Sequence, residues 1–357
     1  MSNLVDKVKD KVAHSSSEPT TTGHATGVVK LVNRPIGPIG YGLMGLTWRA
    51  KPPSSEQSLD AMRASLRVGA NFWNGGELYG TRERNSLHLL NDYFTKYPED
   101  AEKVVLSIKG GLKPGEHAPD GSEANIQRSI DECLRVLDGK KFLDLFECAR
   151  VDPNTPIETT IAAIDNYVQA GKLGGISLSE VSEQTIRKAA QVAKISAVEV
   201  EFSLWSTDIL TNGVAKACSE LNIPIVAYSP IGRGFLTGDI KKPEDLGDDD
   251  MRKTMPRFQG EAFYENIKLV KEIEKVAVKK GAKPGQVAIA WVRAHSGRDG
   301  LPLIIPIPGS STAARVEENS KDVTLTEAEL EELNDILRNF TPVGGRYGGP
   351  AAKLMEG

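Results

Sequence analysis

The sequence predicts a closed (β/α)8 barrel, and three observations support this fold class. From residue 36 onward, short β-branched or apolar runs alternate with amphipathic stretches of 10–18 residues, as strands alternate with helices. The runs typical of strands number eight. No GxGxxG motif follows the first run, which disfavours the alternative, a doubly wound open sheet; the similar "GYGLMG" there is more typical of tight packing.

The elements are expected in a regular order along the chain. Strand patterns cover residues 39–46, 70–75, 104–110, 144–150, 173–179, 197–203, 224–230 and 301–309. Helix patterns cover residues 55–69, 122–139, 156–172, 182–193, 213–222, 313–320 and 326–340. Ser122, with Glu123 beside it, and Pro156 are typical helix start signals, and a glycine follows several of the helices.

Four segments lie outside this alternation. Residues 29–40 are expected to form a small hairpin that closes the bottom of the barrel. Residues 233–259 are charged and poorly periodic, and loops of that length are usually functional or disordered. The Gly-rich tail 341–357 is expected to be irregular. Residues 1–26 are expected to be a disordered extension, which leaves 27–357 as a single barrel domain.

Composition limits the class of function. The chain has 357 residues, a net charge of −4 and a pI of 5.9, so it has no basic surplus for binding nucleic acid. No apolar run is long enough to span a membrane, and the first residues resemble neither a secretory signal nor a mitochondrial presequence. The three cysteines and five histidines fit no disulfide framework or metal spacing, so we expect a reduced, cytoplasmic protein without a metal site.

Polar side chains follow the predicted strands at their carboxyl ends, where barrels carry their chemistry. Asn74 and Tyr79 follow the second strand, and Lys109 ends the third. A nearby ammonium group lowers the pKa of a tyrosine, ~10 in water, toward the working pH and makes it a general acid. The pair therefore predicts a proton donor to a carbonyl oxygen, although a packed tyrosine and a surface lysine are the commoner explanation of two such residues alone.

The order of several motifs resembles the aldo-keto reductase superfamily over residues 36–340. These motifs are "GGELYG", "SIKGG", "DLFECARVDPNTPIE", "GGISLSE", "VEVEFSLW", "AYSPIGRGFLTG" and "IPIPGSSTAARVEEN". The resemblance implies a (β/α)8 barrel that binds NADP(H) in extended form without a Rossmann fold. It also implies an oxidoreductase that reduces aldehydes or ketones, or oxidises alcohols, by direct hydride transfer.

Two of the four catalytic positions of that superfamily are substituted here. Tyr79 matches the general acid and Lys109 its partner, but Asn74 stands at the aspartate position and Ala149 at the histidine position. We expect Asn74 to accept a hydrogen bond from Lys109 without supplying negative charge. Lys109 would then keep more of its field for Tyr79, at the cost of poorer charge balance around a buried lysine. The space beside Ala149 is expected to hold a bulkier substrate ring or a water.

Two segments, "NFWNGGELYG" and "DLFECARVDP", resemble the fungal pyridoxal reductase branch, in which the same two positions are altered. That branch reduces pyridoxal to pyridoxine with NADPH. The resemblance implies the same reaction here, with Tyr79 as the general acid. The phenol beside the aldehyde of pyridoxal can polarise the carbonyl internally, which would offset the missing histidine.

The adenine end of the cofactor is predicted near the last strand. Ser310 and Ser311 begin a loop that enters a helix, where free backbone N–H groups and the helix dipole favour phosphate. Arg315 can pair with a 2′-phosphate or stack on adenine. By resemblance, these residues together with Glu318 and Asn319 bind the 2′-phosphate and adenine. A lysine that some members carry in this loop is absent, so NADP is favoured over NAD but not required.

The nicotinamide end is predicted at the ends of the fifth to seventh strands. Ser179, Glu180 and Glu199 stand where the superfamily binds the carboxamide, although it commonly has Asn or Gln where this chain has the two glutamates. Tyr228 is a candidate to stack on the nicotinamide ring. The pyrophosphate is expected to pass Ser229, Ile231, Arg233 and Gly234, with residues 233–259 folded over it as a clasp.

The substrate and the rival functions are less sharply defined. The expected partner is a small aldehyde or alcohol, and its walls are predicted at Trp48, Ala149, Arg346 and Tyr347. The substituted catalytic positions also fit a pseudoenzyme or a non-catalytic NADP-binding subunit, like the β subunits of some potassium channels. A metal-dependent barrel hydrolase is disfavoured because the strand ends offer no histidine. The oligomeric state stays open.

Overall fold

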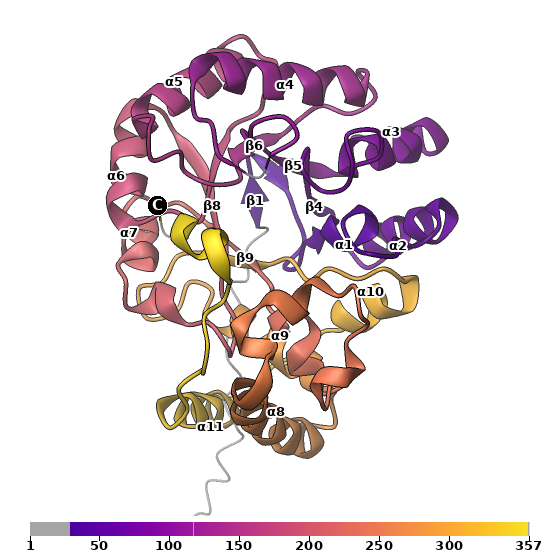
Figure 1. The fold of residues 1–357 in the computed structure, drawn as a ribbon, viewed down its shortest axis with the longest axis vertical. Helices are drawn as coiled ribbons and strands as arrows, with labels where there is room; N and C mark the ends of the chain where they lie inside the picture. The colour runs from indigo at the N-terminus through magenta and orange to yellow at the C-terminus, as the bar shows by residue number, and fades with distance from the viewer. Residues whose placement is uncertain (1–28, 117, 356) are drawn as a thin grey trace, which may run out of the picture.

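The protein is a parallel eight-stranded barrel, seen here in a computed structural model that describes residues 29–116, 118–355 and 357 (Figure 1). Neighbouring strands follow one another in chain order, and every pair in the sheet is parallel. The strands are β3 (Tyr41–Gly42), β4 (Phe72–Gly76), β5 (Val105–Gly110), β6 (Leu145–Cys148), β7 (Ile176–Ser179), β8 (Ile195–Glu201), β9 (Ile225–Tyr228) and β10 (Ile304–Pro306). Each lies within or overlaps one of the predicted strand segments.

Backbone contacts between the first and last strands close the sheet. The N–H of Gly40 donates to Pro306 O at 2.9 Å, and the N–H of Gly42 donates to Pro308 O at 3.4 Å. A parallel bridge also joins Gly42 to Gly309. Glycine is required at position 40 for a steric reason, because a Cβ on Gly40 would lie 2.7 Å from Phe72 O. The predicted closed barrel is therefore confirmed.

Helices surround the barrel and include all those predicted from the sequence (Figure 1). They are α1 (Met44–Thr47), α2 (Ser55–Arg67), α3 (Ser86–Lys96), α4 (Glu123–Leu137), α5 (Ile157–Gln169), α6 (Glu183–Val192), α7 (Val214–Glu220), α8 (Gly260–Lys280), α9 (Pro284–Ala294), α10 (Ala313–Asn319) and α11 (Glu327–Arg338). Ser122 caps α4 by accepting from Asn125 N, as its start signal indicated. Helices α1, α3, α8 and α9 were not predicted, and α1 begins within the segment 39–46 that was predicted as a strand.

Two hydrophobic clusters hold these layers together. The larger lies between the strands and the helices, and it includes most of the buried aromatic side chains. The smaller fills one end of the barrel, where Leu31 and Ile36 pack with Phe72 and Val105. Leu31 lies on β1 (Lys30–Leu31) of a hairpin whose other strand is β2 (Arg34–Pro35), and Ile36 directly follows β2 and donates its N–H to Val29 O at 2.9 Å. The hairpin therefore closes this end of the barrel as predicted.

The two irregular segments are ordered in different ways. Residues 233–259 contain successive 3-10 turns, η3 (Gly232–Thr237), η4 (Pro243–Asp245), η5 (Met251–Thr254) and η6 (Pro256–Phe258). Phe235 stacks on Trp205 with ring centroids 4.3 Å apart, which anchors the segment to the barrel. The tail is less irregular than expected, because it includes η7 (Gly349–Leu354). It runs from α11 back across the barrel to the side of α6 (Figure 1), where Gly357 O accepts from Ser182 N at 2.8 Å.

Further predictions concern the cysteines, membrane spans, metal sites and the start of the chain. The three cysteines are free, as expected. Among the described residues, no helix combines the length and apolarity that a bilayer crossing requires, and no group of acidic, histidine and cysteine side chains is placed to hold a metal ion. The expectation of disorder for residues 1–26 lies outside the described residues, and so does the start of the predicted barrel domain at residue 27.

Candidate active site

The predicted catalytic pair lies at adjacent strand ends. In the sheet, Gly76 at the end of β4 is in register with Lys109 on β5, and Lys109 is in register with Glu147 on β6. The loop after β4 then turns back, and it brings the ring of Tyr79 to 6.0 Å from the Nζ of Lys109. Trp48 stacks on the ring of Tyr79, and the two ring centroids are 5.5 Å apart. The fold therefore brings Tyr79 and Lys109 together.

Lys109 is the centre of a buried polar cluster. Its Nζ donates to Asn74 Oδ1 at 2.9 Å and to Glu147 Oε1 at 2.9 Å, and it forms an ion pair with Glu199 Oε2 at 2.5 Å. Ser177 Oγ donates to the second oxygen of Glu147 at 2.9 Å. Burial lowers the pKa of Lys109, but the two carboxylates outweigh burial and raise that pKa above its usual value. The lysine is therefore charged.

This cluster corrects one expectation from the sequence. Asn74 accepts a hydrogen bond from Lys109, as expected. The expected shortage of negative charge is wrong, because Glu147 and Glu199 both pair with the ammonium group. Lys109 consequently does not reserve its field for Tyr79. Glu199 had been assigned to the nicotinamide carboxamide, but here its carboxylate contacts Lys109 and Asn74.

Tyr79 keeps its proton in this environment. Burial raises its pKa to about 12, and Lys109 opposes that rise while Glu199 and Glu147 add to it. Within the described residues its hydroxyl makes no hydrogen bond, although its backbone O accepts from Thr47 Oγ1 at 2.6 Å. The phenol is therefore a neutral acid whose hydroxyl can meet a ligand. Ala149 is buried and adds no polar group.

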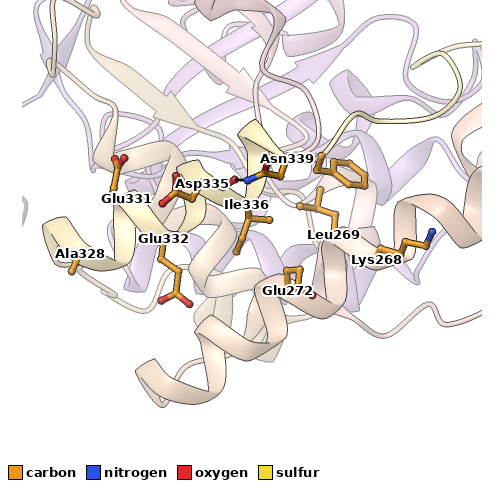
Figure 2. A pocket seen from close by; sticks show the side chains of 10 residues that line it. Lys268, Leu269, Glu272, Ala328, Glu331, Glu332, Asp335, Ile336 and Asn339 are labelled. Carbon is orange, nitrogen blue, oxygen red and sulfur yellow. Dashed lines mark hydrogen bonds between the residues drawn. The ribbon is translucent and has the colours of Figure 1, made fainter.

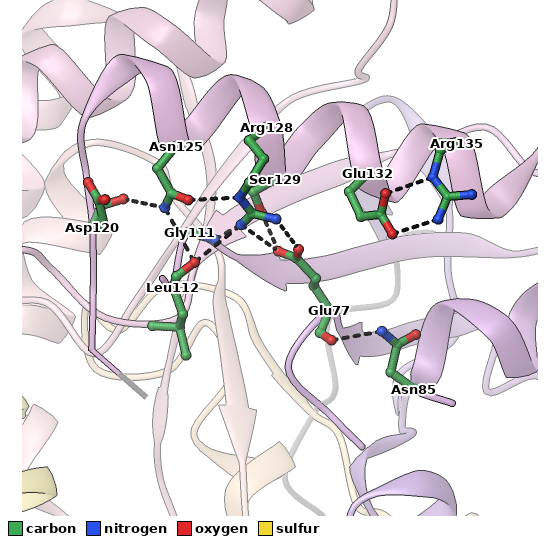
Figure 3. Close-up of polar contacts among 10 residues, drawn as sticks. All are labelled: Glu77, Asn85, Gly111, Leu112, Asp120, Asn125, Arg128, Ser129, Glu132 and Arg135. Carbon is green, nitrogen blue, oxygen red and sulfur yellow. Dashed lines mark hydrogen bonds and ion pairs between the residues drawn. The ribbon is translucent and has the colours of Figure 1, made fainter. Parts of the chain in front are cut away.

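A network on α4 fixes the loop that carries Tyr79 (Figure 3). Glu77, two residues before it, accepts from Arg128 Nη1 at 2.6 Å. Arg128 also donates to Asn125 Oδ1 at 2.8 Å and to Leu112 O at 3.2 Å. Asn85 Nδ2 donates to Glu77 O at 2.9 Å, which ties the start of α3 to the same loop. The network joins the β4 and β5 loops to one helix.

The C-terminal tail brings its two predicted wall residues to the strand ends. Arg346 donates to both oxygens of Glu180 at 3.2 Å. The hydroxyl of Tyr347 lies 3.1 Å from that of Tyr228, and the Cζ of Arg233 lies 4.5 Å from the centroid of the Tyr347 ring. Tail residues and the predicted nicotinamide residues thus share one surface at this end of the barrel.

Arg233, predicted for the pyrophosphate, pairs with Glu201 Oε2 at 3.0 Å in this structure. It lies in a turn with unusual backbone geometry. Ser229 has a φ of 50°, Arg233 of 56° and Gly234 of 88°, and Glu180, which follows β7 two strands away in the sheet, has a φ of 51°. Side chains rarely adopt this region, and residues held there are concentrated at functional sites. Ile231 is buried beside them.

Buried polar atoms without partners mark the predicted cofactor positions. Among the described residues, four buried side-chain polar atoms lack a hydrogen-bond partner: Ser179 Oγ, Trp205 Nε1, Ser310 Oγ and Asn319 Nδ2. All but the indole of Trp205 belong to residues assigned to the cofactor from the sequence. An unpaired buried polar group costs about 1–3 kcal/mol, so a polar ligand along this line would relieve the cost.

The adenine-end residues are held in place by ion pairs. Arg315 pairs with Glu318 at 2.7 Å and with Asp239 at 3.0 Å. The second pair links α10 to the segment 233–259 that was predicted to be a clasp. Ser311 O accepts from Gln57 Nε2 at 2.7 Å, and Ser310 O accepts from Tyr41 Oη at 2.6 Å. The loop at the adenine end is therefore held in place by β3, the first strand of the barrel, and by α2.

A groove of about 700 Å3 lies elsewhere, between α8 and α11 (Figure 2). Leu269, Ile336 and Phe340 form its apolar floor, and glutamates lie along its rim. The groove includes none of the predicted site residues. Its carboxylates have surface partners, such as Lys279 for Glu332 at 2.5 Å. It is therefore separate from the site at the strand ends.

The sequence analysis missed Glu147 and Glu201. Both lie on strands whose neighbours are apolar, and both are buried. Lys, Glu, Arg and Asp are almost never fully buried unless they are paired. An acidic residue within a predicted buried strand is therefore a signal that a cation or a ligand lies opposite, and that signal was available in "DLFEC" and "VEVEF".

Comparisons with known proteins identify relatives of this chain. The chain is 42% identical over 319 residues to a Schizosaccharomyces pombe protein named "Probable pyridoxal reductase 2", covering 87% of this chain and 95% of that one. It is 37% identical to "Aldo-keto reductase yakc [NADP(+)]" of the same yeast, covering 89% and 93%. The solved glycerol dehydrogenase of Gluconobacter oxydans shares the fold, with a TM-score of 0.76 at 21% identity, covering 89% and 97%. The aldo/keto reductase family matches residues 38–338, and the chain therefore belongs to that family.

Proposed function

We propose that this aldo/keto reductase uses NADPH to reduce a small aromatic aldehyde, most specifically pyridoxal to pyridoxine, with Tyr79 as general acid and Lys109 as its partner. The observation that carries the proposal is the buried pair at the ends of β4 and β5, in which a neutral phenol lies beside a charged ammonium group. The name of the S. pombe relative supports pyridoxal as the substrate.

The chemistry requires one hydride and one proton. When bound, NADPH supplies the hydride, with its electron pair, to the carbonyl carbon. Tyr79 donates its proton to the carbonyl oxygen, and an alcohol and a phenolate result. Lys109 stabilises that phenolate because its positive charge favours the ionised form of a neighbouring acid. Water then returns a proton to Tyr79.

The residues present fit an NADP cofactor. Ser179 lies at the proposed nicotinamide end, and Ser310 and Asn319 lie at the adenine end, each with a buried polar atom that lacks a partner. Arg315 would meet a 2′-phosphate by exchanging its contact with Asp239. The printed name of the second S. pombe relative, which specifies NADP(+), supports the same choice. The segment 233–259, which Asp239 links to Arg315 on α10, would close over the cofactor beside that helix.

The test follows NADPH absorbance with purified protein and pyridoxal, with NADH and benzaldehyde as comparisons. We expect NADPH oxidation with pyridoxal, and a loss of kcat by about 10²–10⁴-fold in Tyr79→Phe with unchanged NADPH binding, since general acid catalysis contributes that much. Tyr264→Phe, at a half-exposed ring, is the matched control and should be unaffected. Arg315→Gln should lose the preference for NADPH over NADH.

Three outcomes would contradict the proposal. Unchanged turnover in Tyr79→Phe would remove the tyrosine from the mechanism. Activity on other carbonyls but not on pyridoxal would keep the reductase and reject the substrate. Tight NADPH binding without turnover of any carbonyl would indicate a non-catalytic NADP-binding subunit.

A further inference from the structure

The cluster around Lys109 contains more acidic side chains than basic ones. Two carboxylates, on Glu147 and Glu199, face one ammonium group, and all three side chains are at most 5% exposed. An uncompensated charge at such a depth is strongly destabilising. If both glutamates were ionised, the cluster would hold a net charge of one negative unit. One proton shared between them makes the cluster neutral.

The amide of Asn74 fits this arrangement in one orientation. Its Oδ1 accepts from Lys109 Nζ at 2.9 Å. Its Nδ2 donates to Glu199 Oε2 at 2.6 Å and to Glu147 Oε1 at 3.2 Å. Turning the amide over would place its N–H groups against the ammonium and its oxygen against two carboxylates. An aspartate at this position would have no hydrogen to donate to either glutamate.

The titratable groups facing Lys109 come from several elements. They are Glu147 on β6, Glu199 on β8 and Tyr79 on the loop after β4, and Tyr347 of the tail acts on Tyr79. Burial raises the pKa of Glu199 to about 8, with Lys109 opposing and Glu147 adding to that rise. The direction agrees with the count of charges, since one carboxyl of the pair holds a proton at neutral pH.

We propose that Glu147 and Glu199 share one proton and together form the counter-ion of Lys109, as positioning residues that hold its ammonium group beside Tyr79. Asn74 is the amide that joins the pair, and a carboxylate in its place would overcharge the cluster. This inference rests on the proposed function for its kinetic consequence alone. Loss of the shared proton adds a negative charge beside Lys109, which weakens its field on Tyr79 and makes the phenol a poorer acid.

The test is a cycle of substitutions in the full chain. Asn74→Asp adds a third carboxylate and should lower the melting temperature by about 2 °C or more, and kcat/KM by on the order of tenfold, as charged neighbours in contact are strongly coupled. Adding Glu199→Gln to Asn74→Asp restores the charge count and should recover most of both losses. Glu201→Gln removes a carboxylate from the same strand that faces Arg233 instead, so it should not rescue Asn74→Asp.

The pH profile separates positioning from a merely structural role. In the wild type, kcat should fall as pH rises toward 9 and the shared proton is lost. In Glu199→Gln this limb should be flat, because the amide cannot ionise. Full stability and activity of Asn74→Asp, equal rescue by Glu201→Gln, or an unchanged pH profile in Glu199→Gln would overturn the inference.

Two results keep the proposed function and this inference distinguishable. The melting temperatures of these variants are measured without turnover, so they test the shared proton even if the protein reduces no carbonyl. If Asn74→Asp alone yields no folded protein, recovery of a folded protein by adding Glu199→Gln supports the inference, and failure to recover it is the contrary result.

Discussion

We expect Arg150 to contact the proposed substrate near Tyr79. It follows Ala149 at the end of β6, where its Nη1 donates to Ala149 O at 2.5 Å. Its Cζ lies 5.6 Å from the centroid of the Tyr347 ring. Within the described part of the chain it pairs with no carboxylate, unlike Arg233 and Arg346. A guanidinium group in this setting favours a substrate that carries an anionic oxygen.

A substrate comparison tests this role. Salicylaldehyde carries a phenol beside the aldehyde, as pyridoxal does, and benzaldehyde has none. We expect Arg150→Met to lower kcat/KM for salicylaldehyde by about tenfold or more, since a hydrogen bond to a charged group contributes about 1.5–3 kcal/mol. Benzaldehyde should change little, and Arg150→Lys should retain part of the discrimination. Equal losses with the two aldehydes would show that Arg150 does not contact the phenol.

At the scale of elements, α4 positions the catalytic loop through Arg128. This side chain joins Glu77 on the β4 loop to Leu112 on the β5 loop (Figure 3). We expect Arg128→Gln to lower kcat by about tenfold with little change in KM, because a small displacement of a catalytic group is costly. Arg135 on the same helix pairs with Glu132 at the surface, so Arg135→Gln is the control. A parallel loss in Arg135→Gln would mean that α4 itself had been damaged.

The strands and helices that the sequence predicts are those with a regular hydrophobic period. The strands were recognised because apolar and β-branched runs follow the spacing of a barrel, and helices such as α4 have strong amphipathic patterns with a capping serine. Helix α3 was missed although Asn85 and His88 form a capping box, because histidine is an unusual partner in that motif. The 3-10 turns η3–η6 have no long period, so contacts such as Phe235 on Trp205 had to come from the structure.

For the whole molecule, the barrel brings together residues that lie far apart in the sequence. Their positions at strand ends and the resemblance both indicated Tyr79 and Lys109, and the fold places the Nζ of Lys109 6.0 Å from the centroid of the Tyr79 ring. The partners Glu147 and Glu199 were not predicted as a pair, because 52 positions separate them and only the inward faces of β6 and β8 make them neighbours of one lysine. Charge balance in a barrel interior is a property of all its strands, and no local pattern encodes it.

This interior charge should also govern how stability depends on pH. Glu199 has its pKa raised to about 8 in the folded chain, against ~4.3 when unfolded, so the folded state binds one more proton between these values. Stability therefore falls as pH rises through this window, by at most about 1.4 kcal/mol per pH unit. Burial lowers the pKa of His88 and His295. These two histidines therefore make stability rise with pH below pH ~7, where unfolded histidines still bind protons.

Between pH 7 and 8 the comparison with Glu199→Gln isolates the glutamate. The comparison is needed because burial raises the pKa of the three cysteines, and unfolded thiols, with a pKa of ~8.5, already begin to ionise in this range and add a decline of the same sign. Calorimetric melting curves should show the wild type losing about 2 °C across this range, by the usual relation between free energy and melting temperature. Glu199→Gln should show a clearly shallower decline there, because its amide carries no proton to lose and the thiols alone contribute. A wild-type curve that rises with pH, or a Glu199→Gln curve with the same slope as the wild type, would place the shared proton elsewhere in the barrel.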